Sequence, residues 1–231
     1  NSAFPIIQGR AALASIVLGA SLCPLPAVGT QAAALLEGDR SVPVDARNGM
    51  VVTSHYLATD EALKVLENGG NVIDAAVTAA FALAVTQPRS GNIGGGGFML
   101  VSSESAGEVV AIDYREKAPA GATRDMFLDK DGNVDSDISR YSHKAAGVPG
   151  TGAGLALALE KYGTLSLTDA LAPAIRLADE GFVIPSRFSD GIKASAETLG
   201  KFGSSAKVFF KPDGSFYEPG EVFVQKDLAA T

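Results

Sequence analysis

One segment, residues 71–88 with the sequence NVIDAAVTAAFALAVTQP, constrains the fold more than any other part of the chain. Within residues 75–85 the only polar side chain is that of Thr78. A helix that is apolar on every side is a buried helix, and its alanines allow neighbouring elements to approach closely. Asp74 near the start and Pro88 at the end are typical of a globular helix and not of a membrane span, which needs about 20 apolar residues. The segment therefore predicts a central core helix.

Composition excludes several classes of protein. The 231 residues are 46% hydrophobic and 19% charged, which is typical of a globular chain and not of a disordered one. The formal net charge is −7 and no basic cluster is present, so a nucleic acid is not expected as a partner. With Cys23, His55 and His143 as the only cysteine and histidines, the chain can form neither a disulfide framework nor a zinc cluster.

The first part of the chain has the pattern of a secretory leader. Arg10 precedes an apolar run over residues 11–23, and small residues follow at 27–29 and 32–34. We expect residues 1–34 to be a signal peptide or a disordered leader, and the protein to be periplasmic or extracellular. A buried N-terminal helix is the alternative. Residues 41–231 are then the folded part, with no membrane span.

Periodicity and turn signals predict the elements of this folded part. Residues 51–55 are a strand candidate because they are rich in β-branched residues. A helix follows, with Thr59 as its cap, acidic residues in its first turn and its end at residues 68–70. Residues 98–116 predict a β-hairpin, and a glycine-bearing turn near residue 150 leads into a helix that ends at Gly163.

Three further helices are predicted towards the end of the chain. One is capped at Thr168 and ends at Gly181, and a second is a single helix within residues 184–202. The last residues, QKDLAAT, resemble the opening of a helix. We therefore expect the sequence to be truncated, the alternative being a short helix that frays at the terminus.

The glycine run at residues 94–97 is not a nucleotide-binding motif. A strand follows it, whereas a phosphate loop needs the free amides of a helix N-terminus. Four glycines in a row either allow a tight core crossing between the Ala-rich helix at residues 71–88 and the hairpin at residues 98–116, or form a loop that faces a ligand. G-x-S-x-G and H-E-x-x-H do not occur, so neither a hydrolase elbow nor a zincin site is available, and no cofactor is expected.

Arg115, in the stretch AIDYREKAP, is the candidate binding residue. A guanidinium at the end of a strand can present a fork of donors to a carboxylate. Asp113 lies two residues earlier and therefore on the same side of a strand. Two interpretations remain open from the spacing, namely a structural ion pair with an acid such as Asp113 and the binding of a ligand carboxylate.

Several motifs together carry a resemblance to a known family. The stretch from Asn48 to Val101, followed by IDYREKAP, GVPGTGAGLALALEKYG and LAPAIRLADEGF, resembles the γ-glutamyltranspeptidase family. The resemblance extends over residues 47–231, with the motifs in the same order. It implies an α/β (αββα) N-terminal nucleophile hydrolase fold, incomplete in this chain, of which residues 41–231 are the N-terminal part of a truncated large subunit.

The resemblance also implies a function. Members of the family cleave themselves into two subunits, and the new N-terminal threonine of the small subunit attacks the γ-glutamyl amide of glutathione and related compounds. Arg115 matches the family arginine that binds the α-carboxylate of the substrate, and the glycine run matches a motif with an expected structural role. Thr231 does not match the nucleophile. No catalytic residue is therefore expected in this chain, which needs the small subunit from the same precursor as its partner and is expected to be inactive alone.

Two alternatives to this function remain open. A cephalosporin or glutaryl acylase of the same fold acts on a substrate that also carries a carboxylate, so Arg115 could serve either enzyme. A non-catalytic remnant that binds a ligand or a partner chain is the second alternative.

Overall fold

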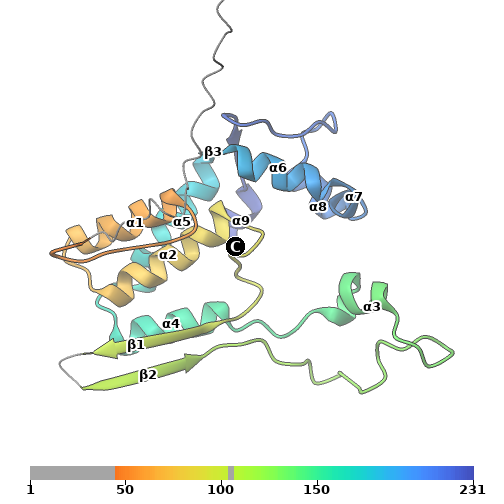
Figure 1. Ribbon diagram of the computed structural model, residues 1–231, viewed down its shortest axis with the longest axis horizontal. Helices are drawn as coiled ribbons and strands as arrows, with labels where there is room; N and C mark the ends of the chain where they lie inside the picture. Colours follow the sequence, from red (N-terminus) through yellow and green to blue (C-terminus); the bar gives the residue numbers. More distant parts are fainter. Residues whose placement is uncertain (1–44, 104–106) are drawn as a thin grey trace, which may run out of the picture. The chain divides into compact units, whose positions relative to one another are not determined.

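Helix α2 (Val72–Thr86) lies at the centre of the packing in the computed structural model, which describes residues 45–103 and 107–231 (Figure 1). Most of its side chains are buried, including those of Val77 and Ala82, which have no exposed surface. Its neighbours in space are α1 (Tyr56–Glu67), α4 (Thr151–Tyr162) and α5 (Leu167–Glu180). The predicted core helix is therefore confirmed.

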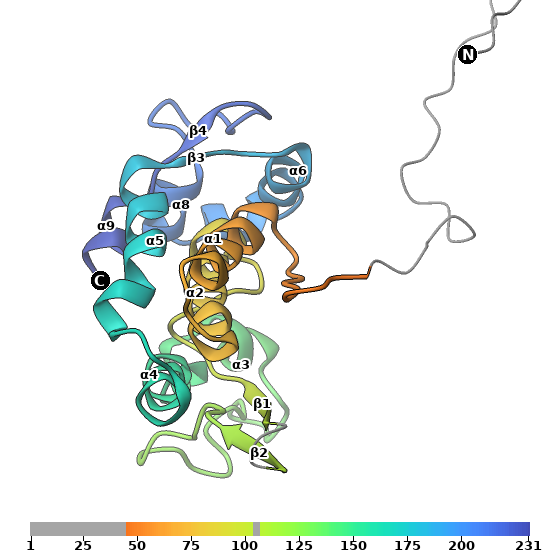
Figure 2. The same ribbon diagram turned by 90° about the vertical axis from the view of Figure 1, so that its left-hand side faces the viewer.

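The described chain is mainly helical and contains two small antiparallel sheets, one formed by β1 and β2 and the other by β3 and β4. Helix α9 packs on α5, as Figure 2 shows. The remaining elements are, in chain order, β1 (Phe98–Ser103), β2 (Glu108–Asp113), α3 (Ser136–Tyr141), the 3-10 helix η2 (His143–Ala145), β3 (Phe182–Val183), α6 (Ser186–Ala194), α7 (Ala196–Gly200), α8 (Gly203–Phe209), β4 (Val222–Phe223) and α9 (Lys226–Ala230).

The start of α2 is fixed by a reciprocal cap. The Asn71 side chain accepts the backbone N–H groups of Ile73 and Asp74 at 2.8 and 3.0 Å, and the Asp74 carboxylate accepts the Asn71 N–H at 2.8 Å. Such a capping box satisfies donors that a helix N-terminus otherwise leaves free. The preceding helix ends at Glu67, as predicted, and Gly69 follows with a φ of +89°.

The beginning of α1 differs from the prediction. His55 caps the helix, its Nδ1 accepting the Leu57 N–H at 3.3 Å, so the helix starts before Thr59. The Thr59 hydroxyl instead lies 2.8 Å from that of Thr53. Residues 51–55 are not a strand either, since no other strand of the described chain pairs with them.

The predicted hairpin is confirmed, but it ends earlier than expected. Strand β1 pairs with β2 in a register that places Phe98 opposite Asp113 and Val101 opposite Val110. Val101 and Ile112 are buried in the core, and β2 contacts α4. Because β2 ends at Asp113, Arg115 follows the strand and does not belong to it.

An aromatic cluster forms the core near β3 and β4. Phe223 is fully buried, and the rings of Phe188 and Tyr217 both lie 5.1 Å from its ring. The single helix predicted within residues 184–202 is divided at Ser195 into α6 and α7. A further difference concerns α5, which Ser166 caps in place of Thr168 by accepting the Asp169 N–H at 3.1 Å.

The predicted leader at residues 1–34 lies outside the described residues, as does Cys23. Where the structure does describe the chain, none of its helices has the length and apolar character needed to cross a bilayer. The same residues contain no group of three or more His, Cys, Asp or Glu side chains placed to hold a metal ion.

Candidate functional site

Arg115 lies just after β2 with an exposed side chain. Its backbone N–H donates to Oδ1 of Asp113 at 3.0 Å, so the neighbouring acid contacts the main chain of Arg115. Among the described residues, no carboxylate lies within 4.0 Å of the guanidinium. The ion pair with Asp113, one of the two interpretations of the sequence, is therefore not formed, and the donors of the guanidinium remain available.

The glycine run packs directly against the backbone of this segment. A Cβ atom on Gly96 would lie 2.6 Å from the Tyr114 carbonyl oxygen and 2.8 Å from the Cα of Arg115. The Tyr114 N–H donates to the Gly97 carbonyl at 3.1 Å. Contacts this short leave no room for a side chain at Gly96 or Gly97. The run therefore makes its close approach to the segment that follows β2, whereas the predicted crossing was between the Ala-rich helix, α2, and the hairpin.

The start of α4 also packs against the segment that contains Tyr114 and Arg115. Cβ atoms built on Gly150 or Gly154 would overlap Tyr114, so both glycines make room for that residue. The N–H groups of Gly150 and Thr151 donate to the Gly95 carbonyl at 2.8 and 3.0 Å. The glycine run, the Arg115 segment and the start of α4 are thus joined through their backbones.

Further contacts reinforce this arrangement. Lys117 and Val148 exchange two backbone hydrogen bonds, of 3.2 and 2.8 Å, which fix the chain on the C-terminal side of Arg115. Asn92 Oδ1 accepts the Gly95 N–H at 2.7 Å and lies 3.0 Å from the Thr151 hydroxyl.

The resulting arrangement is a rigid backbone that carries an exposed arginine. The Tyr114 phenol is neutral near pH 7, because its ordinary pKa is about 10 and burial raises the pKa further, so it adds no negative charge beside the guanidinium. Because the main chain around Arg115 is already ordered, a bound carboxylate orders only one side chain, and the fork of the guanidinium can bind both of its oxygens. The arrangement is suited to binding an acid.

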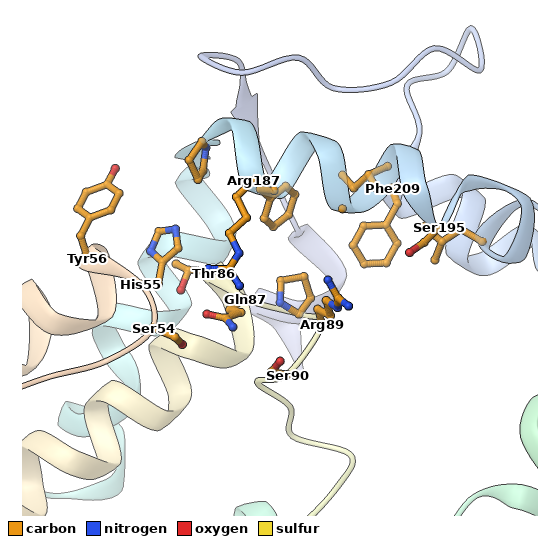
Figure 3. Close-up of a pocket in the computed structure, with 16 residues that line it drawn as sticks. Ser54, His55, Tyr56, Thr86, Gln87, Arg89, Ser90, Arg187, Ser195 and Phe209 are labelled. Carbon is orange, nitrogen blue, oxygen red and sulfur yellow. The ribbon is translucent and has the colours of Figure 1, made fainter. Parts of the chain in front are cut away.

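A cavity of about 710 Å³ opens elsewhere in the described chain, and Arg115 does not line it (Figure 3). Its lining comes from three stretches, residues 54–56, 86–90 and 185–209, that are distant in sequence. Sequence reasoning did not identify it, because no motif joins these stretches. The lining residues are Ser54, His55, Tyr56, Thr86, Gln87, Pro88, Arg89, Ser90, Pro185, Arg187, Phe188, Gly191, Ile192, Ser195, Leu199 and Phe209.

Known proteins resemble the chain in sequence. The family model described as gamma-glutamyltranspeptidase matches residues 58–231. The glutathione hydrolase proenzyme of Escherichia coli (strain K12) is 44% identical in an alignment 231 positions long, which covers 97% of this chain and 39% of that protein. The acylase ACY 1 proenzyme of Pseudomonas sp. (strain V22) is 37% identical in an alignment 195 positions long, which covers 82% of this chain and 35% of that protein. The chain therefore spans well under half the length of these relatives.

Solved structures resemble it as well. The crystal structure of Helicobacter pylori gamma-glutamyltranspeptidase matches with a TM-score of 0.79 and 50% sequence identity, over 81% of this chain and 54% of that one. The expected fold class, an N-terminal nucleophile hydrolase fold that is incomplete in this chain, is confirmed by the similar structures, which have this fold.

Proposed function

Because the chain belongs to the γ-glutamyltranspeptidase family, we propose that it is the N-terminal part of the large subunit of an enzyme that hydrolyses or transfers γ-glutamyl groups. Glutathione and related γ-glutamyl compounds are the proposed substrates. In this proposal Arg115 binds the α-carboxylate of the γ-glutamyl group.

The free guanidinium of Arg115 is the observation that carries the proposal. It is exposed, it has no carboxylate within 4.0 Å among the described residues, and its main chain is packed against Gly96. An arginine kept for structure alone would be expected to have a partner acid or to lie flat against the core. A fixed backbone with a free fork of donors is instead what recognition of a carboxylate needs.

The bond-breaking step belongs to the small subunit in this proposal. The hydroxyl of its N-terminal threonine attacks the γ-glutamyl carbonyl, and its own amine takes the proton. The tetrahedral intermediate then collapses, the amide C–N bond breaks, and the leaving amine departs with that proton, which leaves the acyl-enzyme. Water or an acceptor amine then removes the glutamyl group. The role of Arg115 is to hold the acid head of the substrate so that the carbonyl meets the nucleophile in a fixed position.

Two further points belong to the proposal. The large and small subunits come from one precursor and form a heterodimer, as the proenzyme names of the relatives suggest. The leader pattern at residues 1–34 supports secretion to the periplasm or the extracellular space. The chain without its small subunit is expected to be inactive.

Replacement of Arg115 in the complete enzyme tests the proposal. Arg115→Lys keeps the charge but loses the bidentate geometry, so KM for γ-glutamyl-p-nitroanilide is expected to rise about tenfold or more. Arg124→Lys is the matched control, because Arg124 is almost fully exposed at 96% and approaches only Asp125, at 3.9 Å. Unchanged kinetics in Arg115→Lys would contradict the proposed role.

The similarity to the acylase ACY 1 proenzyme keeps a glutaryl or cephalosporin acylase as the second candidate. Its acyl group also carries a carboxylate, so the Arg115 variant does not separate the two. The complete protein should therefore be assayed on γ-glutamyl-p-nitroanilide and on the corresponding glutaryl amide. We expect faster turnover of the γ-glutamyl compound, whereas a preference for the glutaryl amide would favour the acylase.

A further inference from the structure

The cavity between residues 54–56, 86–90 and 185–209 has an unusual distribution of charge. Its lining contains two arginines, Arg89 and Arg187, and no Asp or Glu, although the whole chain has 26 acidic residues and 19 Lys and Arg residues. Both arginines are exposed, and within the described residues neither has a carboxylate within 4.0 Å. As far as the described residues go, the cavity therefore contains two unpaired cations, in a protein with an excess of acids.

Figure 3 shows how these two side chains lie. The Arg187 side chain extends from α6 towards the end of α2, near Thr86 and Gln87, and the Arg89 side chain lies on the side of Phe209. Arginine forks at two places on one cavity favour an anionic group, because each fork can donate two hydrogen bonds to its oxygens.

His55 lines the same cavity, but its Nε2 lies below the accessible surface. Its Nδ1 accepts the Leu57 N–H at 3.3 Å, so the neutral ring carries its proton on Nε2. Nε2 is buried and has no hydrogen-bond partner among the described residues. Burial lowers the pKa of His55, which keeps the ring neutral near pH 7. A buried donor without an acceptor is costly, but Nε2 has essentially no accessible surface, so His55 contributes ring surface to the cavity wall and no hydrogen bond to a ligand.

The rest of the lining is largely apolar. Phe188, Ile192, Leu199 and Phe209 supply hydrocarbon surface from α6, α7 and α8. A volume of about 710 Å³ is within the range of small-molecule pockets, which are apolar clefts with a few polar groups that fix the orientation of the ligand. The apolar wall indicates that the ligand has a hydrophobic body as well as a charged head.

We propose that this cavity binds a small molecule with one carboxylate or phosphate group on an apolar body. Arg187 and Arg89 contact the anionic group, and the apolar wall packs against the body. The proposal does not depend on the function proposed for Arg115, since Arg115 does not line the cavity.

Calorimetric titration of the complete protein tests this site. Arg115→Gln is used as the background, so that binding at Arg115 does not contribute. The probes are 3-phenylpropionate, phenyl phosphate and the neutral 3-phenylpropionamide. We expect one or both acids to bind, and the amide to bind at least about tenfold more weakly, because it lacks the charge-assisted hydrogen bonds. The acid that binds more tightly identifies the head group.

Variants then assign the binding to the cavity. Arg187→Gln and Arg89→Gln should each weaken binding of the acid about tenfold, whereas the exposed Arg124→Gln should leave it unchanged. Because both cavity arginines are exposed, thermal unfolding should show that these variants fold normally. No binding of either acid, equal binding of the amide, or unchanged affinity in both cavity variants would overturn the proposal.

Discussion

Asp74 on α2 and Thr164, in the turn between α4 and α5, are joined by two hydrogen bonds. The Thr164 hydroxyl donates to Oδ2 of Asp74 at 2.6 Å, and the Thr164 backbone N–H donates to Oδ1 at 2.8 Å. The backbone N–H groups of Leu165 and Asn71 complete the set at 3.0 and 2.8 Å. Asp74 has no exposed surface, so this carboxylate holds the α4–α5 turn against the core helix from within.

Replacing this carboxylate should destabilise the protein. Asp74→Asn places amide hydrogens against several donors, and we expect it to lower the free energy of unfolding by about 3 kcal/mol at pH 7. Urea unfolding of the complete protein, followed by circular dichroism, measures the change. Asp60→Asn is the control, since Asp60 is exposed on α1, and it should shift the midpoint little. Equal midpoints for both variants would contradict a structural role for Asp74.

The same carboxylate predicts a pH dependence. Burial alone raises the pKa of Asp74, but the hydrogen bonds from Leu165, Thr164 and Asn71 outweigh it and leave the pKa lowered. A pKa lower in the folded than in the unfolded state stabilises the fold above about pH 4, and the stabilisation is lost as the pH falls through the folded value. The difference in stability between the wild type and Asp74→Asn should therefore shrink below pH 4. A difference that stays constant down to pH 3 would argue against this linkage.

Gly96 and Gly94, from the same glycine run, allow a matched test of whether the run positions Arg115. A Cβ atom on Gly96 would meet the backbone of Tyr114 to Glu116, whereas one on Gly94 has no atom within 4 Å. Gly96→Ala should displace Arg115, destabilise the protein by about 1–3 kcal/mol and raise KM for γ-glutamyl-p-nitroanilide. Gly94→Ala should change neither quantity appreciably. Similar kinetics in the two variants would show that Gly96 does not position Arg115.

Local signals explain which elements could be predicted from the sequence. Helix α2 is marked by its apolar run, the hairpin by β-branched strands and α4 by its glycine-bearing turn, and each of these signals lies within a few residues. The predictions that were wrong concern positions where two outcomes have equally good local signals. His55 and Ser166 cap helices for which Thr59 and Thr168 were expected, and residues 51–55 have strand composition but no pairing strand among the described residues.

The candidate site was predictable only in part. Arg115 was identified from its motif, and its exposed position is compatible with the expected role. Its support by Gly150 and Gly154, however, comes from residues more than thirty positions away, for which the sequence carries no distance information. The cavity with Arg89 and Arg187 was missed for the same reason, since its lining forms only when α6 packs near the end of α2.

A partly buried ion pair between helices supports a fourth prediction. Glu61 on α1 has a side chain only 8% exposed, and its Oε1 lies 2.7 Å from Nη2 of Arg176 on α5 and 2.8 Å from Nζ of Lys64. Arg176→Gln should lower the free energy of unfolding by about 1–2 kcal/mol, because the buried carboxylate loses one of its two cations.

An exposed ion pair between α9 and α5 is the control for this prediction. Lys226 lies 2.7 Å from Asp179, with side chains 66% and 53% exposed, so Lys226→Gln should cost about 0.5 kcal/mol or less. Urea unfolding measures both variants. A larger loss for Lys226→Gln than for Arg176→Gln would contradict the importance assigned to burial.

Alanine variants of Gly181 and Gly132 allow the cost of backbone strain to be measured apart from the cost of steric overlap. Both have positive φ, +84° and +81°, so alanine at either position adopts a backbone conformation that costs about 1 kcal/mol. Only at Gly181 would the new Cβ also meet neighbours, with Val222 and Val224 side-chain atoms at 2.7 Å and the Phe223 carbonyl at 2.8 Å.

We therefore expect Gly132→Ala to lower the free energy of unfolding by about 1 kcal/mol and Gly181→Ala by about 3 kcal/mol. The larger loss follows because the overlap pushes β4 away from β3, and these strands frame the core around Phe223. Unfolding in urea measures both changes, and near-ultraviolet circular dichroism reports on the aromatic cluster. Equal losses in the two variants would mean that β4 moves freely enough to accept the methyl group.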